Sequence, residues 1–81
     1  MGKFYFHLRM GEEVITDQEG SDCLDISAAR LEALVAARQI LADAIRSGND
    51  DTPEAFVIVD SEGRELATVP LAVVLPRRLR V

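Results

Sequence analysis

The residues best suited to chemistry in this 81-residue chain lie together on one predicted strand near its start. His7, the single histidine, shares a strand face with Tyr5 and Arg9, because side chains two residues apart point the same way. Such a group could support acid–base chemistry. A general base also needs an orienting partner and a pocket, which a flat sheet face does not supply. We therefore expect a structural role for His7 and keep a small ligand-binding or catalytic protein that uses the His7/Tyr5/Arg9 face as the alternative function.

Cys23 is the second candidate, because a thiolate beside a base can act as a nucleophile. The only available base is His7, and nothing in the spacing brings the two together. Burial as a small apolar residue is the commoner fate of a free cysteine. A single cysteine also allows no intrachain disulfide, so nothing indicates an oxidising compartment.

An acidic stretch could hold a hard cation such as calcium. Its spacing, Asp17-x-Glu19-Gly20, does not fit the twelve-residue calcium loop, so we predict no metal site and leave open whether this stretch binds a cation. Its acids are Glu12, Glu13, Asp17, Glu19, Asp22 and Asp25. The glycines are isolated in separate turns and form no phosphate-binding loop, so we also predict no cofactor and, from the lack of any catalytic motif, no enzyme.

Composition and charge restrict the remaining functions. The chain is 48% hydrophobic and 28% charged, which is typical of a globular domain. Residues 1–70 contain six basic and fourteen acidic side chains, a net charge of −8 that disfavours nucleic-acid binding. The last eleven residues contain Arg77, Arg78 and Arg80, so we expect a domain over 1–76 and a short basic tail over 77–81. No apolar stretch is long enough for a membrane span and no signal-peptide pattern is present, which predicts a cytoplasmic protein without membrane partners.

The hydrophobic pattern predicts an α+β fold of the type ββαββ, with one long helix on one face of an antiparallel sheet. The expected elements are a hairpin over 3–9 and 13–16, a loop over 17–25, a helix over 26–47 and a second hairpin over 55–59 and 65–69. The run at 55–59 has no alternation, which indicates a strand that is central or interfacial. Residues 71–75, between Pro70 and Pro76, could form a short strand or a helical turn.

The helix has the clearest boundaries. Asp25 or Ser27 can cap its start, and Gly48 suits the left-handed conformation at its end. Its predicted core stripe consists of Leu34, Ala37, Leu41, Ala44 and Ile45. Further apolar residues lie on the flank of that stripe, and a monomer does not need them. The predicted partner interface is Leu31, Val35, Ala42, Val57 and Val59.

Several short segments together resemble a family of short bacterial proteins, common in alphaproteobacteria, that is classed as a domain of unknown function. They are Phe4-Tyr5-Phe6-His7-Leu8, Val14-Ile15, Asp17-x-Glu19-Gly20, Leu24-Asp25, Ala28-Ala29-Arg30-x-Glu32-Ala33, Asp60-x-Glu62-Gly63-Arg64 and Ala67-Thr68-Val69-Pro70. Met10 stands where the family pattern leads us to expect an Asp-like turn residue. The resemblance implies no activity, substrate or catalytic residue.

We therefore predict a small, non-catalytic protein-interaction module that forms a homodimer, with another protein partner as a further option. An enzyme or ligand binder on the His7 face is the first alternative. The second is a nucleic-acid accessory that uses the arginine tail, which the acidic body of the domain makes unlikely.

Overall fold

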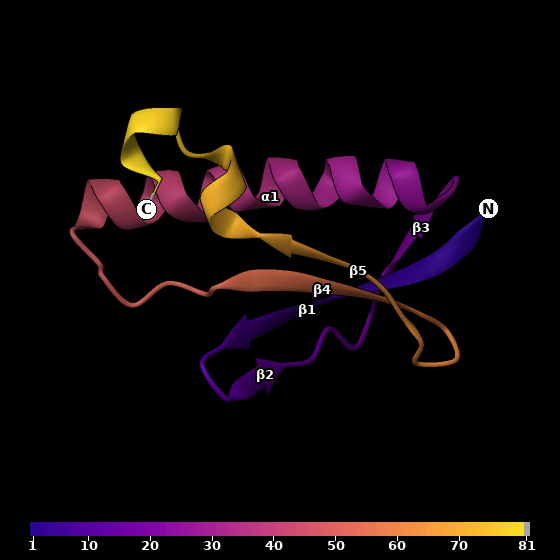
Figure 1. Cartoon of the computed structure of the whole chain (residues 1–81). Helices are drawn as coiled ribbons and strands as arrows, with labels where there is room; N and C mark the ends of the chain where they lie inside the picture. The colour runs from indigo at the N-terminus through magenta and orange to yellow at the C-terminus, as the bar shows by residue number, and fades with distance from the viewer. Residues whose placement is uncertain (81) are drawn as a thin grey trace.

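The protein is a sheet of five strands covered on one face by a single long helix (Figure 1), as seen in a computed structural model that describes residues 1–80. Its elements are β1 (Gly2–Met10), β2 (Glu13–Ile15), β3 (Ser21–Cys23), α1 (Ile26–Ser47), β4 (Ala55–Asp60), β5 (Glu65–Pro70) and two 3₁₀ turns, η1 (Leu71–Val74) and η2 (Arg77–Leu79). The predicted α+β class and antiparallel sheet are confirmed.

No helix in residues 1–80 has the length and apolar character needed to cross a bilayer.

The sheet order is β2-β1-β4-β5, and β3 pairs with the same edge of β1 as β2 does. The prediction of a continuous loop over 17–25 is therefore wrong, because β3 lies within it. β1 is nine residues long and β2 pairs only with its last three, from Leu8 to Met10. Its first residues remain free to pair, and the polar segment Ser21–Cys23 occupies them without any apolar alternation of its own.

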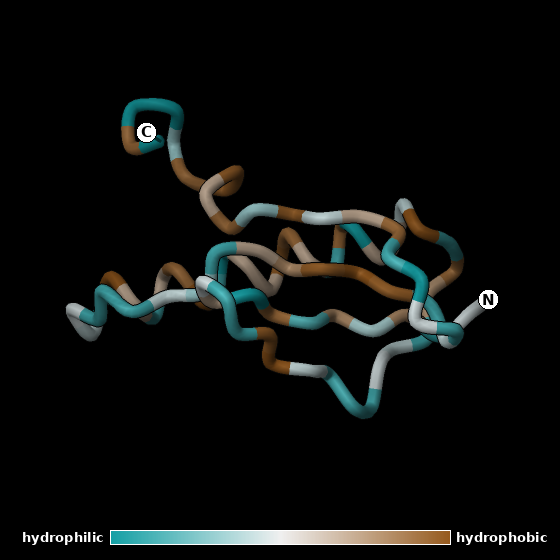
Figure 2. Tube along the Cα trace, turned by 60° about the horizontal axis from the view of Figure 1, so that its bottom comes forward, coloured by the Kyte–Doolittle hydropathy of each residue, from teal (hydrophilic) through white to brown (hydrophobic). Residues whose placement is uncertain are grey.

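The apolar face of the sheet packs under α1. The register places Phe6 opposite Ile58 and Leu8 opposite Phe56, so these four side chains share the helix-facing side. Phe6 and Phe56 meet edge to face, with ring centroids 6.4 Å apart. β4 is a central strand, and every residue from Ala55 to Val59 is buried, as its apolar run predicts. The hydropathy colouring shows this strand as the long apolar band in the middle of the molecule (Figure 2).

Helix α1 begins and ends as predicted. The Asp25 carboxylate accepts the Ala28 backbone N–H at 2.9 Å, and Gly48 adopts a left-handed φ of 72°. Asp25, and not Ser27, is the N-cap.

The predicted core stripe of the helix is partly wrong. Ala29, Ala33 and Ala37 are fully buried, whereas Leu34 and Leu41 are half-buried and Ile45 is 72% exposed. The large phenylalanine and isoleucine side chains of the sheet fill the interface, so the helix presents its smallest residues there and its backbone comes close to the sheet.

The segment after β5 is helical. Residues 71–74 form the 3₁₀ turn η1, which resolves the ambiguity between strand and helical turn. Leu71 is 2% exposed and belongs to the core. In the basic tail, Arg77–Leu79 form η2 and Arg80 Nε donates to the Leu75 carbonyl at 2.9 Å, while Val81 lies outside the described residues.

Candidate functional site

The candidate face of Tyr5, His7 and Arg9 lies on the side of the sheet opposite α1. His7 Nδ1 accepts the Asp17 backbone N–H at 3.0 Å, so that ring nitrogen holds the β2–β3 loop. Arg9 lies 3.9 Å from a Glu54 carboxylate oxygen at an exposed position. Each of these two residues has a structural partner, and the strand places them side by side without a third group that would orient His7 as a base.

The Asp17 side chain fills a gap in the sheet. β2 ends at Ile15 and β3 begins at Ser21, so the middle of that edge of β1 has no strand beside it. Asp17 Oδ2 accepts the Phe6 backbone N–H at 3.1 Å, at the point where a continuous strand would supply a carbonyl. Asp17 Oδ1 accepts from the backbone N–H groups of Glu19 and Gly20 at 3.2 and 3.1 Å. One carboxylate therefore takes the place of a missing strand residue.

These hydrogen bonds change the acidity of Asp17. Partial burial alone would raise the pKa of the carboxyl, but the N–H donors of Phe6, Gly20 and Glu19 stabilise the anion and outweigh it. The pKa of Asp17 is therefore lower than its ordinary value of 3.8. The lowered pKa favours a carboxylate that stays charged and bound to the backbone.

Gly20 completes this turn for two reasons. Its φ of 69° is a left-handed conformation that suits glycine. A Cβ at this position would lie 2.9 Å from Tyr5 Cε2 and 3.0 Å from the Phe4 carbonyl oxygen. The chain therefore needs glycine here for conformation and for space.

The turn between β4 and β5 repeats the pattern. Asp60 Oδ1 accepts the Glu62 and Arg64 backbone N–H groups, each at 2.9 Å, and Gly63 has a φ of 81°. Arg64 Nε also donates to Asp60 Oδ2 at 2.8 Å, and the pKa of Asp60 is lowered, first by the Arg64 N–H. Both Asp-x-Glu-Gly segments are thus turns in which the aspartate carboxylate binds backbone N–H groups, which gives these aspartates a role in the fold.

The sequence model of a family described as a domain of unknown function, DUF6894, matches residues 3–72. The chain belongs to the DUF6894 family. The matched range covers both Asp-x-Glu-Gly turns, α1 and the whole sheet except Gly2. A search of curated proteins finds no match for this chain, and a search of solved structures finds none either.

Cys23, the single cysteine of this chain, is held as a neutral thiol. Cys23 is 6% exposed, and its Sγ donates to a Glu32 carboxylate oxygen at 3.1 Å. Burial, followed by the neighbouring Glu32 carboxylate, raises the pKa of the thiol to about 11. The structure does not bring Cys23 to His7, which binds the β2–β3 loop instead. This environment suppresses the thiolate that a nucleophile requires.

Two of the six acids in the acidic stretch make structural contacts. Asp17 binds three backbone N–H groups and Asp25 caps α1. Within residues 1–80, no three His, Cys, Asp or Glu side chains cluster closely enough to hold a metal ion.

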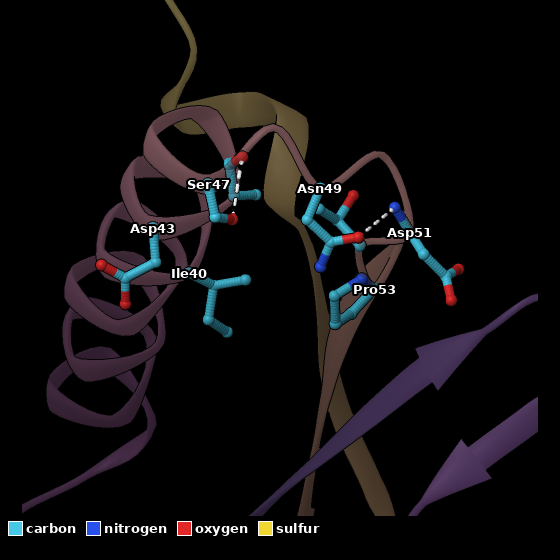
Figure 3. Close-up of a pocket in the computed structure, with 8 residues that line it drawn as sticks. Ile40, Asp43, Ser47, Asn49, Asp51 and Pro53 are labelled. Atoms are coloured by element: carbon cyan, nitrogen blue, oxygen red, sulfur yellow. Dashed lines mark hydrogen bonds between the residues drawn. The ribbon is translucent and has the colours of Figure 1, made fainter.

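The surface of the described chain carries several shallow grooves. Five of them measure 260 to 410 Å³, and Tyr5 and His7 line none of these five. One lies between the end of α1 and the connector to β4 (Figure 3). There the Asp51 backbone N–H donates to Asn49 Oδ1 at 2.9 Å, and the Ser47 hydroxyl donates to the Ala44 carbonyl at 3.4 Å. Asp43 pairs with Arg46 at 3.0 Å. Asn49 Oδ1 and the Ser47 hydroxyl thus have partners within this groove, and Asp43 has its partner, Arg46, outside it.

The predicted partner-interface residues divide into two sets. Leu31 and Val35 are 65% and 52% exposed on the side of α1 away from the sheet, and Ala42 is exposed there too. Val57 and Val59 are only 8% and 6% exposed, on the sheet face opposite α1. The helix residues offer surface to a partner, whereas the two valines offer little area of their own.

The sequence analysis does not identify a second surface, which lies between α1 and β5. A groove of about 340 Å³ runs between α1 and β5, and Arg30, Leu34 and Arg38 line its helix side. These three residues recur every four positions, so their shared helix face, with Leu34 between two arginines, could have been read from the sequence. What the sequence does not supply is that β5 is the edge strand beside them.

Proposed function

We propose that this DUF6894 domain is a non-catalytic protein-interaction module that self-associates through the solvent-facing stripe of α1. We define this stripe as Leu31, Val35, Ala42 and Ile45. Three of its members are large apolar residues that are 65%, 52% and 72% exposed. This row of exposed side chains on one helix is the observation that carries the proposal.

The spacing of the stripe supports helix–helix pairing. The stripe follows the alternating steps of four and three residues that place side chains along one seam of a coiled coil. The steps run through positions 31, 35, 38, 42 and 45, and Arg38 is the one charged residue among them. The stripe lies opposite the fully buried alanines Ala29, Ala33 and Ala37, so the helix is apolar on two opposite faces. Only one of those faces is covered within a single chain.

The partner we propose is a second copy with its α1 antiparallel. This arrangement sets Leu31 against Ala42 of the other copy and Val35 against the aliphatic stem of its Arg38, so that each layer combines a large and a small apolar group. It also brings the Asp25 end of one helix to the Arg46 end of the other. Pairing of this type obeys a two-fold axis and gives a closed dimer.

A catalytic or ligand-binding role on the His7 face has less support. His7 Nδ1 is bound to the Asp17 N–H, and Arg9 faces Glu54. The residues available there serve the fold, so we propose that the domain is not an enzyme.

The oligomeric state tests this proposal. Light scattering after gel filtration should give a dimer mass at high micromolar concentration, and Leu31→Glu or Val35→Glu should give a monomer with an unchanged far-ultraviolet circular dichroism spectrum. Leu66→Glu is the matched control, because Leu66 is a 43% exposed leucine on β5, away from the stripe. A parent protein that stays monomeric at these concentrations would exclude self-association.

A further inference from the structure

The groove between α1 and β5 combines an open strand edge with two arginines. Arg30, Leu34 and Arg38 line its helix side. Its sheet side consists of Thr68, Val69 and Pro70, of which Pro70 has no N–H to offer, and Val73 and Val74 of η1 also line it. Arg38 is the one residue that this groove shares with the proposed helix–helix seam, which uses its aliphatic stem, whereas the groove uses its guanidinium. The inference below does not rest on self-association.

The edge of β5 in this groove offers unpaired backbone groups. β5 pairs with β4 on one side and is the last strand of the sheet on the other. The Leu71 N–H donates to the Glu54 carbonyl at 2.9 Å, and Val69 lies opposite Phe56. Residues two apart on a strand point their backbone groups to the same side. Those of Val69, two residues before Leu71, therefore also face β4, and those of Thr68 face outward. An added strand would pair first with Thr68.

The two arginines of the groove have no acidic partner, which they share only with the tail arginines Arg77, Arg78 and Arg80 among residues 1–80. Arg9, Arg46 and Arg64 each have a carboxylate within 4.0 Å, whereas Arg30 and Arg38 have none within residues 1–80. They lie on a domain whose residues 1–70 have a net charge of −8, so this groove is a local positive site on an acidic body. Charge complementarity therefore favours an acidic occupant.

The spacing of the arginines specifies the acidic residues. Arg30 and Arg38 are eight helical residues apart, which corresponds to about 12 Å along the axis. Four residues of an extended strand span about 13 Å, and side chains at the first, third and fifth positions share one face. Leu34 lies midway between the arginines, and Val73 and Val74 add apolar surface nearby. The matching sequence is acidic-x-apolar-x-acidic.

We propose that this groove binds an extended acidic segment of another protein, of the pattern acidic-x-apolar-x-acidic, as an additional strand on the edge of β5. Its backbone pairs with Thr68, its two carboxylates meet Arg30 and Arg38, and its central apolar side chain packs on Leu34. This mode of recognition obtains affinity from backbone hydrogen bonds and specificity from alternate side chains.

Fluorescence anisotropy with a labelled peptide tests the proposal. The probe contains Glu-Thr-Val-Thr-Glu between short Ser/Thr flanks, and a comparison peptide of the same composition has its two glutamates adjacent. The probe should bind at low salt and more tightly than the comparison peptide. Arg30→Gln and Arg38→Gln should each weaken binding about threefold to fivefold, as expected for exposed charge pairs. Thr68→Pro should abolish it, because proline removes the outward N–H at a position where an edge strand tolerates it.

Two controls separate this site from general charge and from the dimer. Arg46→Gln removes an arginine from the same helix outside the groove, and it should leave peptide affinity unchanged. Leu31→Glu should bind the peptide as tightly as the parent protein, so a failure of self-association and a failure of this site are measured separately. Equal binding of the two peptides, unchanged affinity in both groove arginine variants, or no binding at about 1 mM peptide, near the weak limit of specific association, would overturn the proposal.

Discussion

The Asp17 carboxylate accepts the Phe6 backbone N–H at 3.1 Å, across an edge of the sheet where no strand lies. This contact joins β1 to the loop between β2 and β3, two strands that are too short to form a continuous partner for β1. It also gives the Asp-x-Glu-Gly segment a structural role, since its first carboxylate is bound to backbone donors.

Removal of the Asp17 carboxylate should destabilise the fold. Asp17→Ala leaves the Phe6, Glu19 and Gly20 N–H groups without their acceptor, and we expect a loss of about 1 to 2 kcal/mol in the free energy of unfolding. Glu19→Ala, in the same loop, changes an exposed side chain and should cost less than about 0.5 kcal/mol. Urea denaturation of both variants measures the difference. Equal stabilities would show that water replaces the carboxylate without cost.

The contribution of Asp17 should depend on pH. The pKa of Asp17 is lower in the folded protein than its ordinary value of 3.8, so the charged carboxylate favours folding. Its contribution is complete above pH 3.8 and is lost as the pH falls through the lower, folded value. The difference in unfolding free energy between the parent protein and Asp17→Ala should therefore be constant from neutral pH down to about pH 5 and shrink below about pH 4. A difference that grows on acidification would contradict this assignment.

Gly20 and Gly63 allow a matched comparison of strain and space. Both have a left-handed φ, but a Cβ on Gly63 meets nothing within 4 Å, whereas a Cβ on Gly20 meets the Phe4 carbonyl oxygen at 3.0 Å. Gly63→Ala should cost about 1 to 2 kcal/mol from conformation alone. Gly20→Ala should cost at least about 1 kcal/mol more, because a backbone atom must move. Thermal or urea denaturation of the pair gives the comparison.

Cys23 should react slowly in the folded protein. Its pKa of about 11 and its 6% exposure leave almost no accessible thiolate at pH 8. Alkylation by iodoacetamide should be far slower than for the unfolded chain, and its rate should rise with pH well above pH 9. Glu32→Gln removes the nearby negative charge and should shift that rise to lower pH. Fast labelling of the native protein at pH 8 would refute the buried position.

The alanine face of α1 should not accept a larger residue. Ala33 is fully buried against the sheet, so Ala33→Leu forces the helix away from the sheet and should cost about 1 to 3 kcal/mol. Gln39→Leu introduces the same side chain at an exposed position of the same helix and should change stability by less than about 0.5 kcal/mol. Denaturation midpoints of the two variants test whether close approach of helix and sheet matters.

The elements that were predicted correctly are those with strong local signals. Asp25 and Gly48 define α1 because capping depends on residues adjacent in sequence. The burial of Ala55–Val59 follows from a run of apolar residues that only a central strand accommodates.

The errors concern contacts between distant segments. β3 has no pattern of its own, and it forms because β1 offers a free edge. The buried face of α1 is centred on Ala33 and not on Leu34 and Leu41, because the size of the phenylalanines in the sheet selects the small residues. The groove at Arg30 and Arg38 depends on which strand ends the sheet, and no residue of α1 carries that information.

The interrupted edge formed by β2, the Asp17 turn and β3 has a consequence for assembly. Two three-residue strands separated by a turn give no continuous template for a further strand, whereas the edge on the other side of the sheet is formed by one strand, β5, with a single irregularity near Leu66. A strand can therefore add at one side of the sheet only. Copies of this domain cannot stack edge to edge into a growing filament, because each addition would need the interrupted side of the next copy.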